Sequence, residues 1–354
     1  MANYIIRRLL IMPITLFGVT VLIFGMLSFL SPVERSALYV RDIPHNEAAL
    51  DGIIKRYGLD KAIYCQYWNW LVGRKDPVSG ERIGGIVRGE FGYSRSASQP
   101  VIDLILRRFP ATIELALYTI LAIIVIGVWL GIAAAVNHNK FIDQLARVFA
   151  ILGHSLPSFI IALLLLMIFY ANLKWFPPGR LSDWSNAIVN SAAWNSYTSL
   201  VTVDALLNGR VDIFLDALRH LILPVITLST ISWATYLRIT RSSMLETLRQ
   251  EYVVTARAKG LKEHDVINGH ARPNALIPVA TLSGFTVAGL LGGAVLTETV
   301  FNFPGIGQAA GEAAAQLDVI AVLSFTLLAG LILIVANLLV DIMYAFLDPR
   351  VRLS

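Results

Sequence analysis

Six long apolar runs, separated by polar segments, dominate the pattern of hydrophobic and polar positions along this chain. Each run approaches or exceeds the length of about 20 residues that a helix needs to cross the hydrocarbon core of a bilayer. Because a backbone inside lipid must satisfy its own hydrogen bonds, unbroken runs of this length indicate helices. The pattern therefore predicts an all-α membrane protein with six transmembrane helices, at residues 11–30, 112–136, 149–173, 221–237, 275–295 and 319–347.

The composition agrees with this prediction, since 56% of the 354 residues are hydrophobic and only 15% are charged. The first run follows Arg7 and Arg8, as the apolar part of a signal peptide does, but it ends without a small-x-small cleavage site. We therefore expect it to be retained as the first span. The net charge of +5 is modest and the basic residues lie between spans, which argues against nucleic-acid binding.

Lysine and arginine are concentrated in alternate connections between the spans. Seven of them lie between Arg238 and Arg272, whereas residues 305–318 contain none. Because basic residues favour the cytoplasmic side, both termini are predicted to be cytoplasmic in a multi-pass protein of the cell (inner) membrane. Arg107 and Arg108 lie on the outer side against this rule, but they follow a long polar segment, where the rule is weak.

The polar segments predict the domain organisation. Helical patterning at residues 46–57 and 61–71, followed by glycine-rich turns, indicates a small folded extracytoplasmic cap between spans one and two. The chain thus divides into residues 1–30 (N-terminus and first span), 31–110 (extracytoplasmic cap) and 111–354 (transmembrane core), the last with a cytoplasmic loop at about 241–274.

The sequence contains no catalytic or metal-binding constellation. Cys65 is the only cysteine, which excludes an internal disulfide and a thiolate cluster, and we expect it to be a small packing residue. No G-x-x-x-x-G-K-[ST] phosphate loop occurs, so this polypeptide cannot hydrolyse ATP by itself. We expect a non-catalytic subunit that binds no cofactor of its own.

The polar stretch from Tyr252 to Pro278 is unusual because it lies between two apolar runs. Its order predicts a helix rich in small residues, a stop at Gly260 in the left-handed conformation, and a second short helix with acidic residues in its first turn. Pro273 and Pro278 then return the chain to the membrane. A rigid, polar pair of short helices of this kind is suited to contact a soluble partner.

This stretch resembles a known family. The run Y-V-x-T-A-R-A-K-G-L, with N-A-L-I-P at 274–278, is similar to the EAA loop of permeases of binding-protein-dependent ABC importers, most of all to the B-type subunit of the dipeptide/oligopeptide subclass. Where that pattern commonly has arginine just before Asn-Ala, this chain has Pro273, with Arg272 before it. The resemblance implies that the residues that couple the chain to an ATPase are Tyr252, Thr255, Ala256, Arg257, Ala258, Lys259 and Gly260.

Further motifs of the same family follow in the family's order over nearly the whole chain. G-E-F-G-Y-S at 89–94 and R-F-P-A-T-I-E-L at 108–115 precede or enter span two. S-L-P-S-F at 155–159 lies in span three, E-x-x-F-x-x-P-G-x-G at 298–307 follows span five, and D-P-R at 348–350 matches the ending. The P-G-x-G turn suggests a short gate-like element. The motif and gate candidates are Ser155, Pro157, Glu298, Phe301, Pro304, Gly305 and Gly307.

The resemblance implies a type I ABC importer permease fold and a permease subunit that forms half of a translocation path. The implied partners are a second homologous permease, two cytoplasmic ATPases that bind ATP and magnesium, an extracytoplasmic solute-binding protein and membrane lipid. Di- and oligopeptides are the expected cargo and a heterodimer of permeases the expected assembly, but oligosaccharides, other solutes and a homodimer stay open. An ion-coupled carrier would bury carboxylates near the middle of the membrane, whereas this chain has them near the span ends.

Polar residues and glycines inside the spans also carry expectations. We expect Glu114 and Asp341 to be structural, with Glu114 bonded to neighbouring backbone or to Arg108. His154 is expected to be a packing or hinge residue beside Pro157, which bends the third span. Four glycines that allow close helix approach, at a subunit interface or along a pore, are Gly284, Gly289, Gly292 and Gly293.

Overall fold

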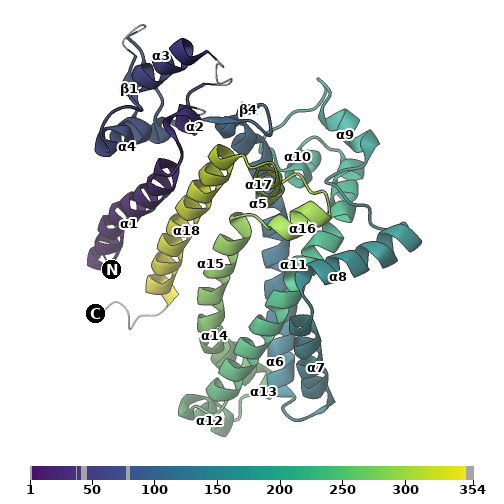
Figure 1. The fold of residues 1–354 in the computed structure, drawn as a ribbon. Coiled ribbons are helices and arrows are strands. Elements are labelled where there is room, and N and C mark those ends of the chain that lie inside the picture. Colours follow the sequence, from purple (N-terminus) through teal and green to yellow (C-terminus); the bar gives the residue numbers. More distant parts are fainter. Residues whose placement is uncertain (1, 37, 41–45, 77–79, 348–354) are drawn as a thin grey trace.

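Long helices packed side by side form the body of the protein, and shorter elements cover both of its ends (Figure 1). Some predictions concern parts of the chain that the structure does not describe, namely those for the side chains of His154 and Asp341 and for the motif at 348–350. The structure is a computed structural model that describes residues 2–36, 38–40, 46–76 and 80–347.

The long elements match the predicted apolar runs in position. They are α1 (Ala2–Ser28), α5 (Val101–Ala122) with η2 (Ile123–Val128) and α6 (Trp129–Val136), α7 (Phe141–Ser155) with α8 (Ser158–Leu165) and η3 (Leu166–Asn172), α11 (Val211–Thr247), α15 (Ile277–Leu291), and α18 (Val319–Leu347).

Within the described residues, three helices are long and apolar enough to cross a membrane: Leu10–Ser28, Val101–Val136 and Val319–Val340. Two bent helix pairs, one through α7 and α8 and one ending in α15, raise the number to five if each pair is one span. The predicted fourth span at 221–237 lies inside α11, which is 37 residues long but is not among these helices. The count of six spans therefore stays a prediction.

The third predicted span is broken where the sequence contains Pro157. α7 ends at Ser155 and α8 begins at Ser158, and Leu156 between them is extended, with ψ of 135°. A proline ring disfavours the helical conformation of the residue before it, which explains why the helix stops at this point. The predicted bend at Pro157 is confirmed.

α11 lies at the centre of the bundle, in contact with α5, η2, α6 and α7. Glycines make the closest of these approaches possible, since a Cβ at Gly127 would lie 2.7 Å from the Cβ of Tyr236, and one at Gly131 would lie 2.5 Å from the Cβ of Thr240. The buried Tyr236 also donates a hydrogen bond to Thr286 Oγ1 at 2.9 Å, which joins α11 to α15.

Two of the four glycines predicted to allow close helix approach in the fifth span, Gly284 and Gly293, make close contacts within the chain. A Cβ at Gly284 would lie 1.8 Å from Cγ2 of Val340, so this glycine lets α15 pack closely against α18. Gly293 has φ of 96°, and a Cβ there would lie 2.8 Å from the backbone nitrogen of Gly307. The sequence pattern predicts a subunit interface or pore for these residues, whereas the structure gives both of them a partner inside the same chain.

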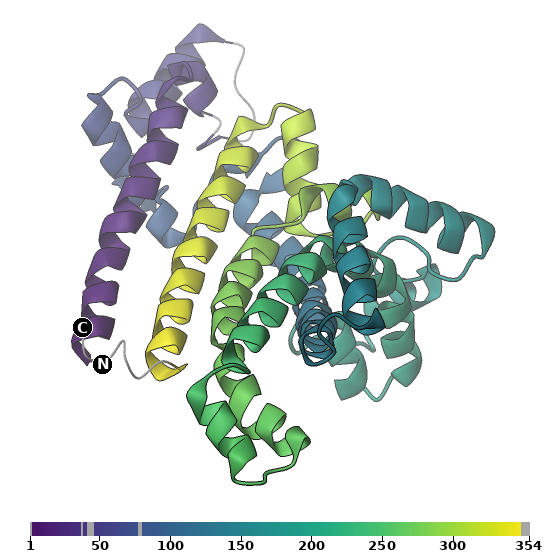
Figure 2. The same ribbon diagram turned by 90° about the horizontal axis from the view of Figure 1, so that it is seen from below.

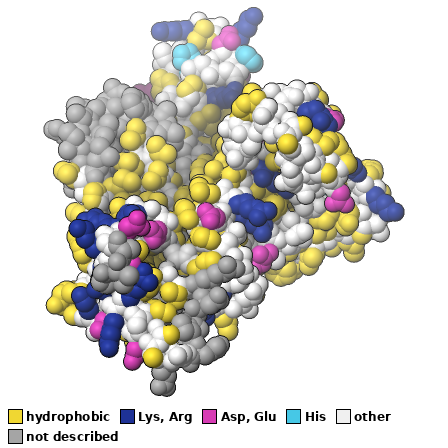
Figure 3. All heavy atoms as spheres, turned by 90° about the horizontal axis from the view of Figure 1, so that it is seen from above, with side chains coloured by type: hydrophobic (Ala, Val, Ile, Leu, Met, Phe, Trp, Pro, Cys, Tyr) yellow, Lys and Arg dark blue, Asp and Glu magenta, His cyan; other side chains and the backbone are white. Residues whose placement is uncertain are grey.

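Short elements form a cap at one end of the bundle. The helical patterns at 46–57 and 61–71 correspond to α3 and α4, and Asn46 begins the first of them by accepting a hydrogen bond from the Ala48 nitrogen at 3.0 Å. Basic and acidic side chains lie together on this end of the molecule (Figure 3). The elements are α2 (Pro32–Ser36), α3 (Glu47–Tyr57), α4 (Ile63–Val72), β1 (Arg74–Lys75), β2 (Arg82–Ile83), η1 (Ile86–Arg88), β3 (Tyr93–Ser94) and β4 (Gln99–Pro100), with β1 antiparallel to β2 and β3 antiparallel to β4.

A buried carboxylate joins this cap to α18. Asp318, just before α18, accepts hydrogen bonds from the hydroxyl of Ser94 at 2.8 Å and from the backbone nitrogen of Ser96 at 3.0 Å. Burial alone would raise the pKa of the Asp318 carboxyl, but its hydrogen bonds outweigh burial and hold that pKa below its usual range. The cap is therefore fixed to the bundle by charge-assisted hydrogen bonds as well as by apolar packing.

The opposite end of the bundle carries the start of α1, the end of α18 and the polar stretch after α11 (Figure 1). α1 and α18 pack against each other along their length, as the view from below also shows (Figure 2). Both termini lie at the end that carries the polar stretch after α11, and their cytoplasmic position stays a prediction.

Candidate functional site

The polar stretch between α11 and α15 folds into the predicted order of helix, glycine turn and second helix. Gly260 has φ of 80°, in the left-handed region that costs a residue with a Cβ about 1–2 kcal/mol. Apart from its chain neighbours, no described residue has an atom within 4 Å of the position of its Cβ, so the backbone conformation, not crowding, requires glycine. The elements are α12 (Glu251–Ala258), α13 (Glu263–Asp265), η4 (Val266–Ala271) and α14 (Arg272–Ala275).

One side of α12 is buried in the protein's own core. Val253 and Ala256, three positions apart and hence on one helix face, are buried at 0% and 6% exposure. They pack in a cluster with Met244 of α11, Ala271 and Ala275. Ala256 is thus part of the joint between the loop and the membrane helices, whereas the family resemblance suggests a role in coupling to an ATPase.

The other side of α12 is exposed to solvent. Tyr252 and Val254 are exposed at 43% and 54%, and Thr255, Ala258 and Lys259 are exposed as well. Small residues next to an exposed aromatic ring form a narrow, partly apolar surface of the kind that a groove in another protein can enclose. Five of the predicted coupling residues, Tyr252, Thr255, Ala258, Lys259 and Gly260, lie on this exposed surface.

Arg257 braces the loop internally. Its guanidinium donates to both carboxylate oxygens of Glu263, at 3.0 Å from Nε and 2.6 Å from Nη2. This bidentate pair crosses the turn at Gly260 and joins the end of α12 to the start of α13. The structure therefore gives Arg257 a partner within the loop that sequence spacing did not identify.

The gate candidates gather in part around a buried carboxylate between α16 (Val295–Val300) and α17 (Ile306–Ala315). Glu298 is 0% exposed and accepts hydrogen bonds from Thr112 Oγ1 at 3.2 Å and from the backbone nitrogens of Gln308 at 2.9 Å and Ala294 at 3.3 Å. Thr112 in turn accepts one from the Ile306 nitrogen at 2.8 Å. One side chain therefore holds α5, α16 and α17 together.

The two glycines of the P-G-x-G turn leave room for this carboxylate. A Cβ at Gly305 would lie 2.3 Å from Oε2 of Glu298, and one at Gly307 would lie 2.7 Å from the Val295 nitrogen. Phe301 is fully buried, and its carbonyl oxygen accepts a hydrogen bond from the Gly179 nitrogen at 2.7 Å. These motif residues form a packed junction, with Pro304 half-buried beside it.

Ser155 and Pro157 lie apart from that junction, exposed at the break between α7 and α8. Ser155 donates a hydrogen bond to the Ile151 carbonyl oxygen at 2.7 Å, within its own helix. The predicted gate residues are therefore divided between two places in the fold.

Glu114 has a partner other than the expected Arg108. Its buried carboxylate accepts from Arg180 Nε at 2.8 Å and from the backbone nitrogen and hydroxyl of Thr202 at 2.7 and 2.8 Å. Arg108 instead donates to Gln308 Oε1 at 3.1 Å. Glu114 thus joins α5 to the segment that carries α9 (Asp183–Val189) and α10 (Val201–Leu207).

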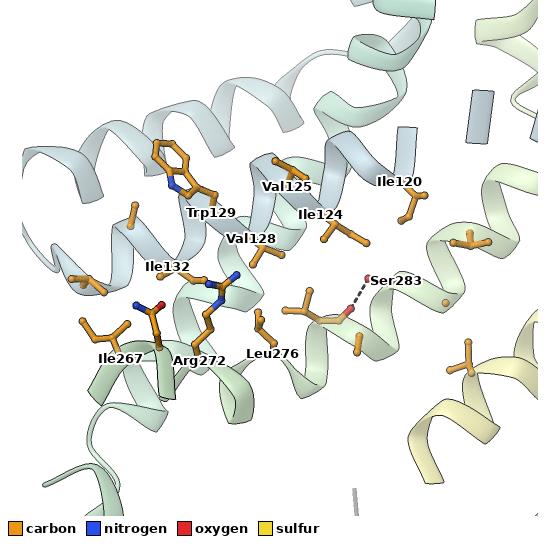
Figure 4. Close-up of a pocket in the computed structure, with 18 of the residues that line it drawn as sticks. Ile120, Ile124, Val125, Val128, Trp129, Ile132, Ile267, Arg272, Leu276 and Ser283 are labelled. Atoms are coloured by element: carbon orange, nitrogen blue, oxygen red, sulfur yellow. Dashed lines mark hydrogen bonds between the residues drawn. The ribbon is translucent and has the colours of Figure 1, made fainter. Parts of the chain in front are cut away.

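An apolar cavity of about 1060 Å³ opens between η2 and α6 on one side and α14, α15 and α18 on the other (Figure 4). Its walls are mostly aliphatic, with Trp129 on the side of α6 and Ser283 on α15. Arg272 extends into it toward Ile132. Trp129 and Arg272 are cavity residues that sequence reasoning did not assign, because their common position depends on how α14 is turned against α6.

Comparison with known proteins identifies relatives over the full chain. The family model described as binding-protein-dependent transport system inner membrane component matches residues 127–353, and the N-terminal model of such membrane components matches residues 1–116. The di/tripeptide transport system permease protein DppB of Pseudomonas aeruginosa is 38% identical over 354 residues, 99% of each chain. The probable D,D-dipeptide transport system permease protein DdpB of Escherichia coli is 36% identical, covering 94% of this chain and 93% of that protein.

A solved structure shares the fold. It is an inward-facing conformation of the MetNI methionine ABC transporter, with a TM-score of 0.50 and 13% identity, covering 69% of this chain and 96% of that one. The predicted family resemblance is confirmed by the match over residues 127–353 and by the similarity to these permeases. The chain belongs to the family of binding-protein-dependent transport system inner membrane components, which are the permease subunits of ABC importers.

Proposed function

We propose that this chain forms half of the translocation path of an ATP-driven peptide importer, with six spans and both termini in the cytoplasm. The observation that supports it best is the two-sided α12. Val253 and Ala256 fix the helix to the membrane core, while Tyr252 and Lys259 face solvent. A helix that is anchored on one side and bare on the other can transmit the movement of a docked partner to the spans.

The partners follow from this role. Two cytoplasmic ATPases, which bind ATP and magnesium, dock on α12 of this chain and on its equivalent in a second, homologous permease. An extracytoplasmic solute-binding protein delivers cargo at the cap end, in keeping with the binding-protein dependence in the family's name. ATP-driven closure of the ATPases then rocks the spans, and cargo crosses between the two permeases.

Di- and oligopeptides are the proposed cargo. Relatives at 34–38% identity are named as transport proteins for di/tripeptides, D,D-dipeptides and oligopeptides. In cells that lack other peptide uptake, a labelled dipeptide should accumulate only when this chain and its partners are present and ATP is available. Unlabelled peptides should compete, and oligosaccharides should not.

Two outcomes of that uptake experiment would contradict the proposal. Competition by an oligosaccharide but not by peptides would overturn the cargo. Transport by this chain alone in liposomes, without ATPase subunits, would instead indicate an ion-coupled carrier.

Breaking the brace between Arg257 and Glu263 should weaken coupling more than it weakens the fold. Both side chains are partly exposed, at 39% and 55%, and such pairs contribute only about 0.2–1 kcal/mol to stability. Arg257→Ala should therefore leave the amount of protein in the membrane unchanged but lower peptide uptake by roughly two- to five-fold, since 1.4 kcal/mol corresponds to a factor of ten. Initial rates of labelled peptide uptake, normalised to membrane content, measure this effect.

A double-mutant cycle shows whether the two residues act as a pair. The charge exchange Arg257→Glu with Glu263→Arg should restore part of the lost uptake, and Arg257→Ala with Glu263→Ala should be no worse than either single change. Effects that simply add would show that the brace plays no part in coupling.

A further inference from the structure

An open, basic cavity of about 670 Å³ lies between α7 and α11, at the end of the bundle that carries α12. Arg147 of α7 and Arg238 and Arg241 of α11 line it, together with Ser242. None of the described lining residues is acidic, and the apolar lining residues include Ile151. The cavity is separate from the α12 surface and from the apolar cavity at Arg272.

A single buried carboxylate orients two of these arginines. Asp143, 0% exposed, accepts from Arg241 Nε at 2.6 Å and Nη2 at 2.9 Å, and from Arg147 Nη2 at 2.7 Å. Two guanidinium groups thus face one carboxylate, and Arg238 adds a third positive charge, which leaves a net positive charge at the cavity. Arg238 is exposed, and the structure gives its side chain no hydrogen bond or ion pair within the described residues.

The surface beside the cavity is apolar. Along α7, the side chains of Leu145, Val148, Ile151 and Leu152 are exposed at 52–65%. This helix is part of a bent pair that is apolar and long enough to cross a membrane. A basic cavity at the end of such a helix, continuous with its exposed aliphatic face, has the two parts that a phospholipid needs: a site for the phosphate and a surface for the chains.

We propose that this cavity binds an anionic phospholipid, with its phosphate at Arg238, Arg241 and Arg147 and its acyl chains along α7. Ser242 adds a hydroxyl donor at the rim. Guanidinium groups suit this ligand because they donate two parallel hydrogen bonds to a phosphate and remain charged at any physiological pH. The lipid would brace the connection between α6 and α7 against the part of α11 that leads into the α12 loop.

The test is a lipid titration of the purified full-length chain in detergent, followed by native mass spectrometry. Phosphatidylglycerol is compared with phosphatidylcholine that has the same acyl chains, and inorganic phosphate is added as a competitor. Phosphatidylglycerol should be retained preferentially, and Arg238→Gln should weaken its binding about five-fold, in line with about 1 kcal/mol per basic side chain near an anionic lipid surface. Because Arg238 has no partner to lose within the described residues, the fold should be unaffected.

Arg249→Gln is the matched control, since Arg249 is exposed at the same end but does not line the cavity. An equal loss of lipid from the Arg249 and Arg238 variants would overturn the site, because it would show unspecific attraction. Displacement by millimolar phosphate, with no preference between the two lipids, would assign the cavity to free phosphate instead. If Arg238→Gln left lipid binding intact but reduced binding of the ATPase subunits, the cavity would be a protein contact and the proposal would fail.

Discussion

Replacing Glu298 with alanine is expected to destabilise the protein by about 3–5 kcal/mol. Three donors lose their acceptor in this variant, and each buried donor left without one costs about 1–3 kcal/mol. The Glu298 carboxylate accepts from Thr112, Ala294 and Gln308, and it lies where three helices meet. The apparent melting temperature of the purified protein in detergent should fall by roughly 5–10 °C, which size-exclusion chromatography after heating measures. Peptide uptake should be lost in parallel.

Two further variants separate this effect from a simple loss of charge. Glu312 lies on the neighbouring α17 but is exposed, so Glu312→Ala should change stability by less than about 0.5 kcal/mol. Glu298→Gln keeps the shape of the side chain and one acceptor oxygen but turns an NH₂ group toward backbone donors. Its stability should therefore lie between those of the wild type and the alanine variant. If the Glu298→Ala and Glu312→Ala proteins had the same apparent melting temperature, the Glu298 carboxylate would not hold the junction.

The positions of the long helices could be predicted from the sequence because the constraint behind them is local. An apolar run of bilayer length must form a helix, whatever it packs against. The break at Pro157 and the left-handed Gly260 are local for the same reason, since each depends on the residue's own ring or missing Cβ. The predicted span at 221–237 is part of the longer helix α11, whose charged residues lie on both sides of the apolar run, so the run alone does not fix where the helix begins and ends.

The partners of the polar residues could not be predicted, because they are set by contacts across the fold. Glu114 and Arg180 are 66 residues apart, and nothing in the sequence favours this arginine over the nearer Arg108. The inward direction of Ala256 has the same origin, since small residues occur on both sides of α12. A family motif identifies the helix, but only packing against α11 and α14 shows which side is left for a partner.

Buried carboxylates recur at three places where a polar connection meets the bundle. Glu114 holds the segment before α11, Asp318 holds the cap, and Asp143 holds the turn between α6 and α7. Each has its lone pairs filled by hydrogen bonds, as a buried charge requires. The bundle is therefore held to these three segments by hydrogen-bonded carboxylates. Under the proposed function, movement imposed at α12 would reach the spans only if the α12 turn is equally well held.

For that reason, Gly260→Val is expected to uncouple ATP hydrolysis from peptide uptake. Valine in the left-handed conformation costs at least about 1–2 kcal/mol, so the turn will relax and α12 will no longer be held in one orientation. A destabilisation of this size changes the population of the native turn by a factor of about 5–30, and uptake should fall by a similar factor. The protein should still reach the membrane, because Gly260 is exposed and the described part of the chain leaves the position of its Cβ open.

Two control substitutions separate backbone strain from added side-chain bulk. Asparagine tolerates the left-handed conformation, so Gly260→Asn should retain most of the uptake. Gly269, in the same loop, also has open space around its Cβ position but has no positive φ, so Gly269→Ala should be neutral. Membrane content, ATP hydrolysis by the assembled complex in vesicles and uptake of a labelled dipeptide are measured for each variant. Loss of uptake in the asparagine variant as well would mean that bulk, and not backbone strain, matters at this turn, while normal uptake in the valine variant would remove the turn from the coupling path.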